Sequence, residues 1–355
     1  MHLSILIPTH RDSLLVCSRI AQACSWASDD IEVIVRDNSG SAEKRELLGK
    51  FQRDNCRIIF AEPCDGLENF FEVLRPAKGE FVFMIADDDF CFDHAIASLP
   101  RILASVRGDQ SVIGVAGAYA IESSQGTSFA TYKNLDSDDV AARLAGYLSY
   151  PGPNVLYYSP LRRVLFQRLL DFFAKTLPFY FSYHDQIACL LYLLNGKFVP
   201  LPRLLYLYDF GAWETGELAQ KRDVGPYKSA GLDPAMNKLH WYLCGFEGAA
   251  LILNSSEFFN YPRPLRQSLA DAWFAAMFAR FKRNPRLTFE SPLATEAEKL
   301  CASLRTSTGQ LSFQGMLAEI SGFMALTAKK QAMDYFYYWD SLLNKRELDL
   351  RKTGT

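Results

Sequence analysis

The chain has 355 residues, of which 49% are hydrophobic and 22% charged, and its formal net charge is -2. This length accommodates one large α/β domain with an appended module, or two ordinary domains, and it excludes a disulfide-stapled miniprotein. The composition excludes a disordered or collagen-like chain, and the balanced charge argues against nucleic acid as a partner.

The longest apolar run, residues 187–194, is too short for the roughly 20 residues that cross a bilayer. Residues 1–8 lack the basic leader of a signal peptide. We therefore expect a cytoplasmic protein without a transmembrane helix. The eight cysteines form no C-x-x-C pair, which favours reduced structural thiols over zinc ligands.

Strands and helices are predicted to alternate through the first part of the chain. Apolar β-branched runs predict strands over 3–8, 31–35, 57–60 and 81–86, and periodic apolar residues predict helices over 13–26, 41–51 and 67–77. Strands this apolar, buried on both faces, indicate a parallel sheet with crossover helices. Ligands of such sheets bind beyond the carboxyl ends of the strands.

The following residues continue the pattern and then become purely helical. We expect a helix to about residue 106, a strand over 112–119, a loop over 122–139, a helix from 183 to Gly196, and short strands over 198–201 and 204–210. Beyond residue 233 only helical stretches follow, near 234–254, 264–283, 293–305, 311–327 and 329–349. The sequence thus predicts a mostly parallel α/β domain over 1–215, a linker over 216–233 and a helical C-terminal domain over 234–355.

The strongest chemical signal is the triplet Asp87, Asp88 and Asp89, directly after the strand expected over 81–86. Three adjacent carboxylates cannot all be buried unpaired, so a cation is the natural compensation. Hard oxygen ligands favour Mg²⁺ or Mn²⁺, which would also bridge a substrate diphosphate. A solvated acidic turn would explain a bare triplet, but the position at the end of a buried strand favours a metal site.

Two more polar clusters end strands on the same edge of the predicted sheet, at residues 8–11 and at residues 37–39. Each alone is an ordinary turn with a helix cap. Together with the acid triplet they indicate a nucleotide pocket. Neither G-x-G-x-x-G nor G-x-x-x-x-G-K-[ST] follows these strands, which argues against dinucleotide and P-loop binding.

Three runs carry a family resemblance: ILIPTHR (5–11), IEVIVRDNSGS (31–41) and GLENFFEVLRPAKGEFVFMIADDDF (66–90). They resemble family 2 glycosyltransferases of the GT-A fold, well over residues 1–120 and weakly to 215. The resemblance implies metal-dependent, inverting transfer of a sugar from a nucleotide-diphosphate donor, usually a UDP-sugar. The acceptor would be a saccharide, a lipid-linked glycan or a cell-surface polymer.

The resemblance also implies roles for individual residues. Asp37 would hydrogen-bond the base, and Asp89 would ligate the Mn²⁺ or Mg²⁺ that holds the diphosphate. The remaining nucleotide-sugar contacts would come from Pro8, Thr9, Arg11, Asn38, Asn69, Asp87 and Asp88.

Inverting transfer of this kind proceeds by direct displacement of the diphosphate by the acceptor hydroxyl. It needs a general base that takes the proton of that hydroxyl, and we expect Asp185 in that role. Asp185 begins a predicted helix, whose positive end favours the ionised carboxylate by about 0.3 to 1 kcal/mol. The family usually has Glu-Asp here and this chain has His184-Asp185, so an ordinary helix-start acid remains an alternative. Asp209, Glu214 and His184 are the next candidates.

The other imidazoles and aromatic residues allow two interpretations each. His184 is either structural or an acceptor contact, and His240 is the candidate should a metal recruit an imidazole. Tyr208 and Trp213, near Tyr206, could stack on an acceptor sugar, although core packing is the more common role of such residues.

Residues 263–286 carry a net charge of +5 beside an apolar, aromatic face. A helix of this kind near 264–283 can contact an anionic membrane, or it can pack in a core with a solvated basic end. Two other function classes also stay open: a catalytically silent GT-A-like binding module, and a nucleotidyltransferase. The latter normally has a glycine-rich basic loop after the first strand, where this chain has THRDS.

Overall fold

The computed structural model describes residues 2–150, 152, 154–209, 216–255, 258–284, 286, 289–306 and 312–352. The chain forms two compact units whose segments interleave along the sequence. The first unit comprises Met1–Asp171 and Asn195–Gly211, and the second comprises Phe172–Leu194 and Ala212–Thr355. Whether residues 1–215 and 234–355 fold as separate domains stays a prediction.

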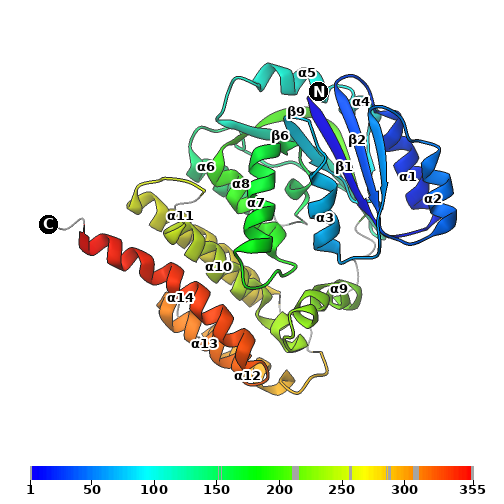
Figure 1. The fold of residues 1–355 in the computed structure, drawn as a ribbon. Helices are drawn as coiled ribbons and strands as arrows, with labels where there is room; N and C mark the ends of the chain where they lie inside the picture. Colours follow the sequence, from blue (N-terminus) through cyan, green and yellow to red (C-terminus); the bar gives the residue numbers. More distant parts are fainter. Residues whose placement is uncertain are drawn as a thin grey trace. The chain divides into compact units, whose positions relative to one another are not determined.

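A parallel half-sheet forms the first part of the first unit. Its strands run in the order β3-β2-β1-β4 and are β1 Leu3–Thr9, β2 Ile31–Asp37, β3 Cys56–Phe60 and β4 Phe81–Met84. The connecting helices are α1 Leu14–Ser25, α2 Ala42–Gly49 and α3 Gly66–Leu74. Figure 1 shows α1 and α2 on one side of β1 and β2, with α3 on the other. The predicted alternation is confirmed.

Each connecting helix begins with a side-chain cap close after a strand. Ser13 accepts a hydrogen bond from the Val16 amide, Ser41 from the Lys44 amide and Asp65 from the Glu68 amide. These caps satisfy amides that have no partner within the helix. The helix N-termini are thereby fixed at the carboxyl edge of the sheet, beside the polar strand ends.

The second half of the sheet is mixed and differs in part from the sequence-based prediction. It contains β5 Phe90–Cys91, β6 Val112–Ser123, β7 Gly126–Ala130, β8 Leu161–Arg162 and β9 Lys197–Asp209. Strand β8 is antiparallel to both β4 and β6, and β9 is parallel to β6 and antiparallel to β5. The expected loop over 122–139 was wrong in part, because β7 pairs with β6 to form a hairpin.

Other helices of the first unit are α4 Asp93–Ile96, α5 Leu99–Val106 and α6 Val140–Leu148, and the short 3-10 helix η1 spans Val155–Tyr157. The single helix expected over 93–106 is therefore divided, with Pro100 in the first turn of α5. Helix α7, Arg163–Lys175, continues into the second unit.

Within its described residues, the second unit contains only helices. After α8 His184–Asn195 come α9 Gly216–Ser229, η3 Pro234–Leu239, α10 His240–Asn254, α11 Arg263–Arg283, α12 Ala294–Thr306, α13 Phe313–Ala325 and α14 Lys329–Lys352. Helix α10 lies beside α11, and α13 beside α14 (Figure 1). The predicted helical C-terminal part is confirmed, and the expected linker over 216–233 contains α9.

Helix α11 uses its apolar face for packing within the second unit. Trp273 is fully buried and donates from its indole to the Cys244 carbonyl of α10 at 2.9 Å. Gly248 leaves space for this ring, since a Cβ there would lie 2.1 Å from the indole nitrogen. Lys282 and Arg283 at the helix end are exposed. No helix in the described part of the chain has the length and apolarity needed to cross a membrane.

Candidate functional site

The carboxyl ends of three parallel strands meet where the sequence predicts a pocket. Parallel pairing places Thr9 of β1 beside Asp37 of β2. The Thr9 hydroxyl donates to Asp87, which follows β4, at 2.6 Å. Pro8 is buried within β1, one residue before Thr9. Three residues that are far apart in sequence therefore form one continuous polar floor.

Arg11 neutralises the first two acids of the triplet. Its guanidinium forms ion pairs with Asp87 and, at 2.9 Å, with Asp88. Burial alone would lower the pKa of Arg11, but the two carboxylates raise it. Asp87 is buried, whereas Asp88 and Arg11 are 27% and 33% exposed. Arg11 and Asp88 are thus the charged groups at this point that face solvent.

Lys44 of α2 is part of this site, and sequence reasoning missed it. Its side chain is only 1% exposed. The ammonium donates to the Thr9 hydroxyl at 2.7 Å, to Asp37 at 2.9 Å and to the Arg11 carbonyl. A lysine in the first turn of a helix is normally a solvated residue that opposes the helix dipole. The sequence alone therefore does not predict the burial of Lys44. The burial follows from the strand register, which pairs Thr9 with Asp37 and so places these two partners of the ammonium side by side.

A second group of hydrogen-bonded side chains in this site consists of Asp37, Asn38 and Asn69. Asp37 is 3% exposed and accepts from both the amide and the hydroxyl of Ser39, at 3.2 and 3.1 Å. The side-chain amide of Asn69 donates to the side-chain oxygen of Asn38 at 2.9 Å, and the side-chain amide of Asn38 donates to the Cys64 carbonyl at 3.0 Å. These contacts fix the side chains at the ends of β2 and the start of α3 before any ligand binds.

Asp89 lies at the other end of the triplet and has different partners. Its carboxylate accepts from the Tyr206 hydroxyl at 2.6 Å and from the Asp209 amide at 2.9 Å, both on β9. Burial raises the pKa of Asp89 to about 7, although these two hydrogen bonds act in the opposite direction. The nearby carboxylates of Asp88 and Asp209 raise it further. Among the described residues, no Lys, Arg or His forms an ion pair with Asp89.

This charge distribution fits a divalent cation. Asp89 is a buried carboxylate whose ionised form is disfavoured by burial and by two neighbouring acids, and a cation would reverse that preference. Within the described ranges, no three His, Cys, Asp or Glu side chains are grouped as a complete metal site. Mg²⁺ commonly binds through one or two carboxylates and completes its shell with water and substrate phosphates. Asp88 and Asp89 suit that mode of binding.

The aromatic residues near β9 divide between core and surface. Tyr206 is fully buried and stacks on Tyr158, with ring centroids 5.1 Å apart. Tyr208 is half-buried, and its ring centroid lies 6.0 Å from that of Tyr158. Trp213, and the alternative base Glu214, lie outside the described residues. Tyr206 therefore belongs to the core, whereas Tyr158 and Tyr208 are each partly exposed.

The predicted base belongs to the second unit. Asp185 is half-buried in the first turn of α8, and its carboxylate accepts from the Gln186 amide at 2.6 Å. His184 is 1% exposed: its Nδ1 accepts from the Phe181 amide at 2.7 Å, and its Nε2 lies 3.0 Å from Glu247 of α10. An Nδ1 that accepts must be unprotonated, so the proton lies on Nε2. His184 is thus held by two hydrogen bonds within the second unit, and its role as an acceptor contact stays a prediction.

His240, the imidazole considered for a metal, is also in the second unit. It is 4% exposed, and burial together with Arg286 and His184 lowers its pKa. The acid triplet belongs to the first unit.

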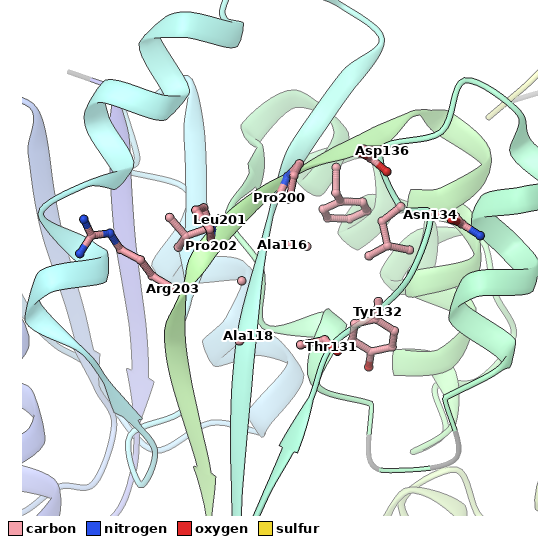
Figure 2. A pocket seen from close by; sticks show the side chains of 13 residues that line it. Ala116, Ala118, Thr131, Tyr132, Asn134, Asp136, Pro200, Leu201, Pro202 and Arg203 are labelled. Carbon is pink, nitrogen blue, oxygen red and sulfur yellow. The ribbon is translucent and has the colours of Figure 1, made fainter.

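A separate pocket of about 220 Å³ lies along β6 and β9 of the first unit. Figure 2 shows it between Ala116 and Ala118 of β6, the segment with Tyr132 and Asn134, and the Pro200–Arg203 stretch of β9. In this view the charged side chains of Asp136 and Arg203 lie at opposite ends of the lining. It contains none of the strand-end residues.

Sequence comparisons match a part of the chain to a known protein. No protein-family model matches the chain. GalNAc(5)-diNAcBac-PP-undecaprenol beta-1,3-glucosyltransferase of Campylobacter jejuni is 28% identical over 103 residues, which is 27% of this chain. The chain covers 33% of that relative's length.

Solved structures resemble the chain over nearly its full length. Residues 1–349 of S. aureus TarS align with a TM-score of 0.51 and 13% identity, covering 98% of this chain and 92% of that one. The TarS complex with UDP-GlcNAc aligns with a TM-score of 0.52 and 15% identity over the same shares of the two chains. The fold is therefore the GT-A fold of glycosyltransferases, and the comparisons support the resemblance to family 2.

Proposed function

We propose that the protein is an inverting glycosyltransferase that moves a sugar from a UDP-linked donor to a saccharide, lipid-linked glycan or polymer acceptor. The observation that carries this proposal is the polar floor of Thr9, Asp37 and Asp87 at the carboxyl ends of adjacent parallel strands. The TarS complexes with UDP and UDP-GlcNAc support a UDP-sugar donor. The lipid-linked glycan in the name of the Campylobacter jejuni relative supports that class of acceptor.

We assign the donor contacts to two parts of the site, the side of Asp37 and the side of the aspartate triplet. Asp37 would accept a hydrogen bond from the base, with Pro8, Asn38 and Asn69 completing that side of the pocket. Arg11 is one-third exposed and could pair with the diphosphate oxygens. Asp88 and Asp89 would hold Mn²⁺ or Mg²⁺, which when bound neutralises charge on the leaving diphosphate.

The transfer itself would be a single displacement. The acceptor oxygen forms a bond to the anomeric carbon while the bond from that carbon to the diphosphate breaks, and the electron pair leaves with the UDP. Asp185 takes the proton of the acceptor hydroxyl, which raises the nucleophilicity of the oxygen as it attacks. Attack on the face opposite the leaving group inverts the anomeric configuration.

The strand-end contacts also bear on the alternative functions. A nucleotidyltransferase would need a basic glycine-rich loop after β1, where this chain has Arg11 held by two carboxylates. A silent binding module would bind nucleotide sugars without releasing UDP from them. The distinction is therefore experimental and does not depend on the fold.

Titration of the full chain with UDP in the presence and absence of Mn²⁺ tests donor binding, and UDP release from UDP-GlcNAc tests turnover. We expect UDP to bind and to raise the melting temperature, more so with Mn²⁺. CDP serves as the control nucleotide. A protein that binds neither UDP nor UDP-GlcNAc at millimolar concentration would contradict the proposal, and binding without UDP release in the presence of candidate acceptors would favour the silent module.

A further inference from the structure

Glu247 of α10 is a buried carboxylate that the proposed mechanism does not use. Its side chain is 2% exposed. Oε1 accepts from the hydroxyls of Tyr183 and Tyr335, each at 2.8 Å, and Oε2 lies 3.0 Å from Nε2 of His184. A carboxylate removed from water costs free energy unless hydrogen bonds replace its hydration. These three contacts provide that replacement, and they fix the side chains that make them.

The three donors to Glu247 are uncharged. Because Nδ1 of His184 accepts from the Phe181 amide at 2.7 Å, the ring is neutral and Nε2 carries the proton that points to Glu247. Burial and the charge of Glu247 raise the pKa of Tyr183 and of Tyr335, so both hydroxyls keep their protons. Among the described residues, no Lys or Arg forms an ion pair with Glu247. The carboxylate therefore serves as an acceptor for neutral side chains.

Two of these donors, Tyr183 and His184, directly precede Asp185 in the turn that begins α8. The Gln186 amide donates to the Tyr183 carbonyl at 3.0 Å and to the Asp185 carboxylate at 2.6 Å. The carboxylate of Asp185 is thus bound to the same amide that closes the turn at Tyr183. Side chains that hold this turn in place consequently also hold the Asp185 carboxylate.

We propose that Glu247 is a positioning residue for the base. Its contacts with Tyr183 and His184 fix the first turn of α8, and this turn sets the direction of the Asp185 carboxylate. Tyr335 of α14 donates to the same oxygen as Tyr183 but lies outside that turn. The inference rests on the proposed function, since Asp185 is the base of that reaction, and all of these residues belong to the second unit.

The two tyrosines provide a matched pair of variants. Tyr183→Phe and Tyr335→Phe each remove one buried hydroxyl that donates to the same carboxylate oxygen at 2.8 Å. We expect similar losses of melting temperature, because the two bonds are alike in length and burial. Turnover is measured in the full chain as UDP release from UDP-GlcNAc with Mn²⁺. It should fall in Tyr183→Phe and stay at the wild-type value in Tyr335→Phe.

Glu247→Gln should lower turnover by about 10- to 100-fold, the scale expected when a catalytic group moves by about 1 Å. If the new amide keeps its oxygen at the two hydroxyls, its NH₂ group meets the Nε2–H of His184. If the amide is turned round, the Tyr183 hydroxyl loses its acceptor. Either orientation removes a contact with the first turn of α8. UDP affinity, measured by calorimetry, should not change, and Glu319→Gln, at an exposed site on α13, is the control.

The protonation of His184 is a readout that does not depend on turnover. NMR of nitrogen-labelled histidine in the wild-type chain should show a proton on Nε2 and none on Nδ1, with the signal identified by its loss in His184→Gln. This measurement and the tyrosine pair still decide the matter if melting curves show that Glu247→Gln is unfolded.

The inference fails, and the proposed function stands, if folded Glu247→Gln releases UDP like the wild type, if the two tyrosine variants have equal turnover, or if Nδ1 of His184 carries a proton. A wild-type chain that neither binds UDP nor releases it from UDP-GlcNAc would overturn both.

Discussion

Three adjacent aspartates have three different environments in this protein. Asp87 is buried against Thr9 and Arg11, Asp88 is partly exposed beside Arg11, and Asp89 is buried against β9. The sequence shows the same letter three times, so the environment alone distinguishes the residues. We therefore expect substitutions of neighbouring acids to have different effects.

Asp89→Asn should remove the dependence of UDP binding on Mn²⁺. The amide keeps the shape of the carboxylate but lacks the charge and one hard oxygen ligand. UDP titrations with and without Mn²⁺ measure the effect, and Asp93→Asn, an exposed acid four residues further on, is the matched control. A variant that retains the wild-type response to Mn²⁺ would show that Asp89 is not the ligand.

Asp185→Asn should lower turnover by about 10² to 10⁴ while UDP affinity stays unchanged, because the amide cannot accept the acceptor's proton. UDP release from UDP-GlcNAc is measured beside UDP calorimetry and a melting curve. Asp271→Asn, an exposed acid on α11, is the control. If Asp185 is only a helix-start acid, the variant will lose some stability and keep its turnover.

At the scale of elements, Glu32 of β2 joins several strands and loops. It accepts from Ser4 of β1 at 2.6 Å, from Arg57 of β3 at 2.7 Å and from the Lys78 and Gly79 amides before β4. Burial by itself raises the pKa of Glu32, but these hydrogen bonds and the Arg57 charge outweigh it and lower the pKa. One carboxylate thus ties together the four parallel strands.

This lowered pKa predicts a loss of stability in acid. A carboxyl whose folded-state pKa lies below its unfolded value contributes stability above the unfolded pKa and loses it as the pH falls through the folded one. We expect the unfolding free energy of Glu32→Gln to be below that of the wild type at pH 7, with the difference shrinking below about pH 4. Urea unfolding at several pH values measures this. A difference that is constant with pH would contradict the assignment.

The elements also show what the sequence can and cannot specify. The alternation of β1 to β4 with α1 to α3 was predictable, because fully apolar runs and capped helices are local signals. Strand β9 was predicted as two short strands, over 198–201 and 204–210. A register shift in its pairing with β6, between Ala116 and Ala118, allows one continuous strand to include Pro202. Lys44 was missed for a similar reason, since its partners lie on other elements.

At the scale of the whole molecule, we expect the basic end of α11 to meet an anionic surface mainly through charge, because Trp273 and the other buried apolar residues of this helix are already packed. We expect weak binding to anionic vesicles at low salt, released as salt screens the charges. Lys282→Glu with Arg283→Glu should abolish it, and neutral vesicles are the control. Sedimentation with vesicles that persists in high salt would instead require an apolar contact.

The interleaving of the two compact units has a consequence for how the protein can be divided. The chain passes from one unit to the other after Asp171, after Leu194 and after Gly211. A truncation after residue 215 would keep Tyr183 and His184 of the second unit while removing Glu247, which accepts hydrogen bonds from both. No single cut yields either unit whole, so we expect heat to unfold the full chain in one calorimetric transition.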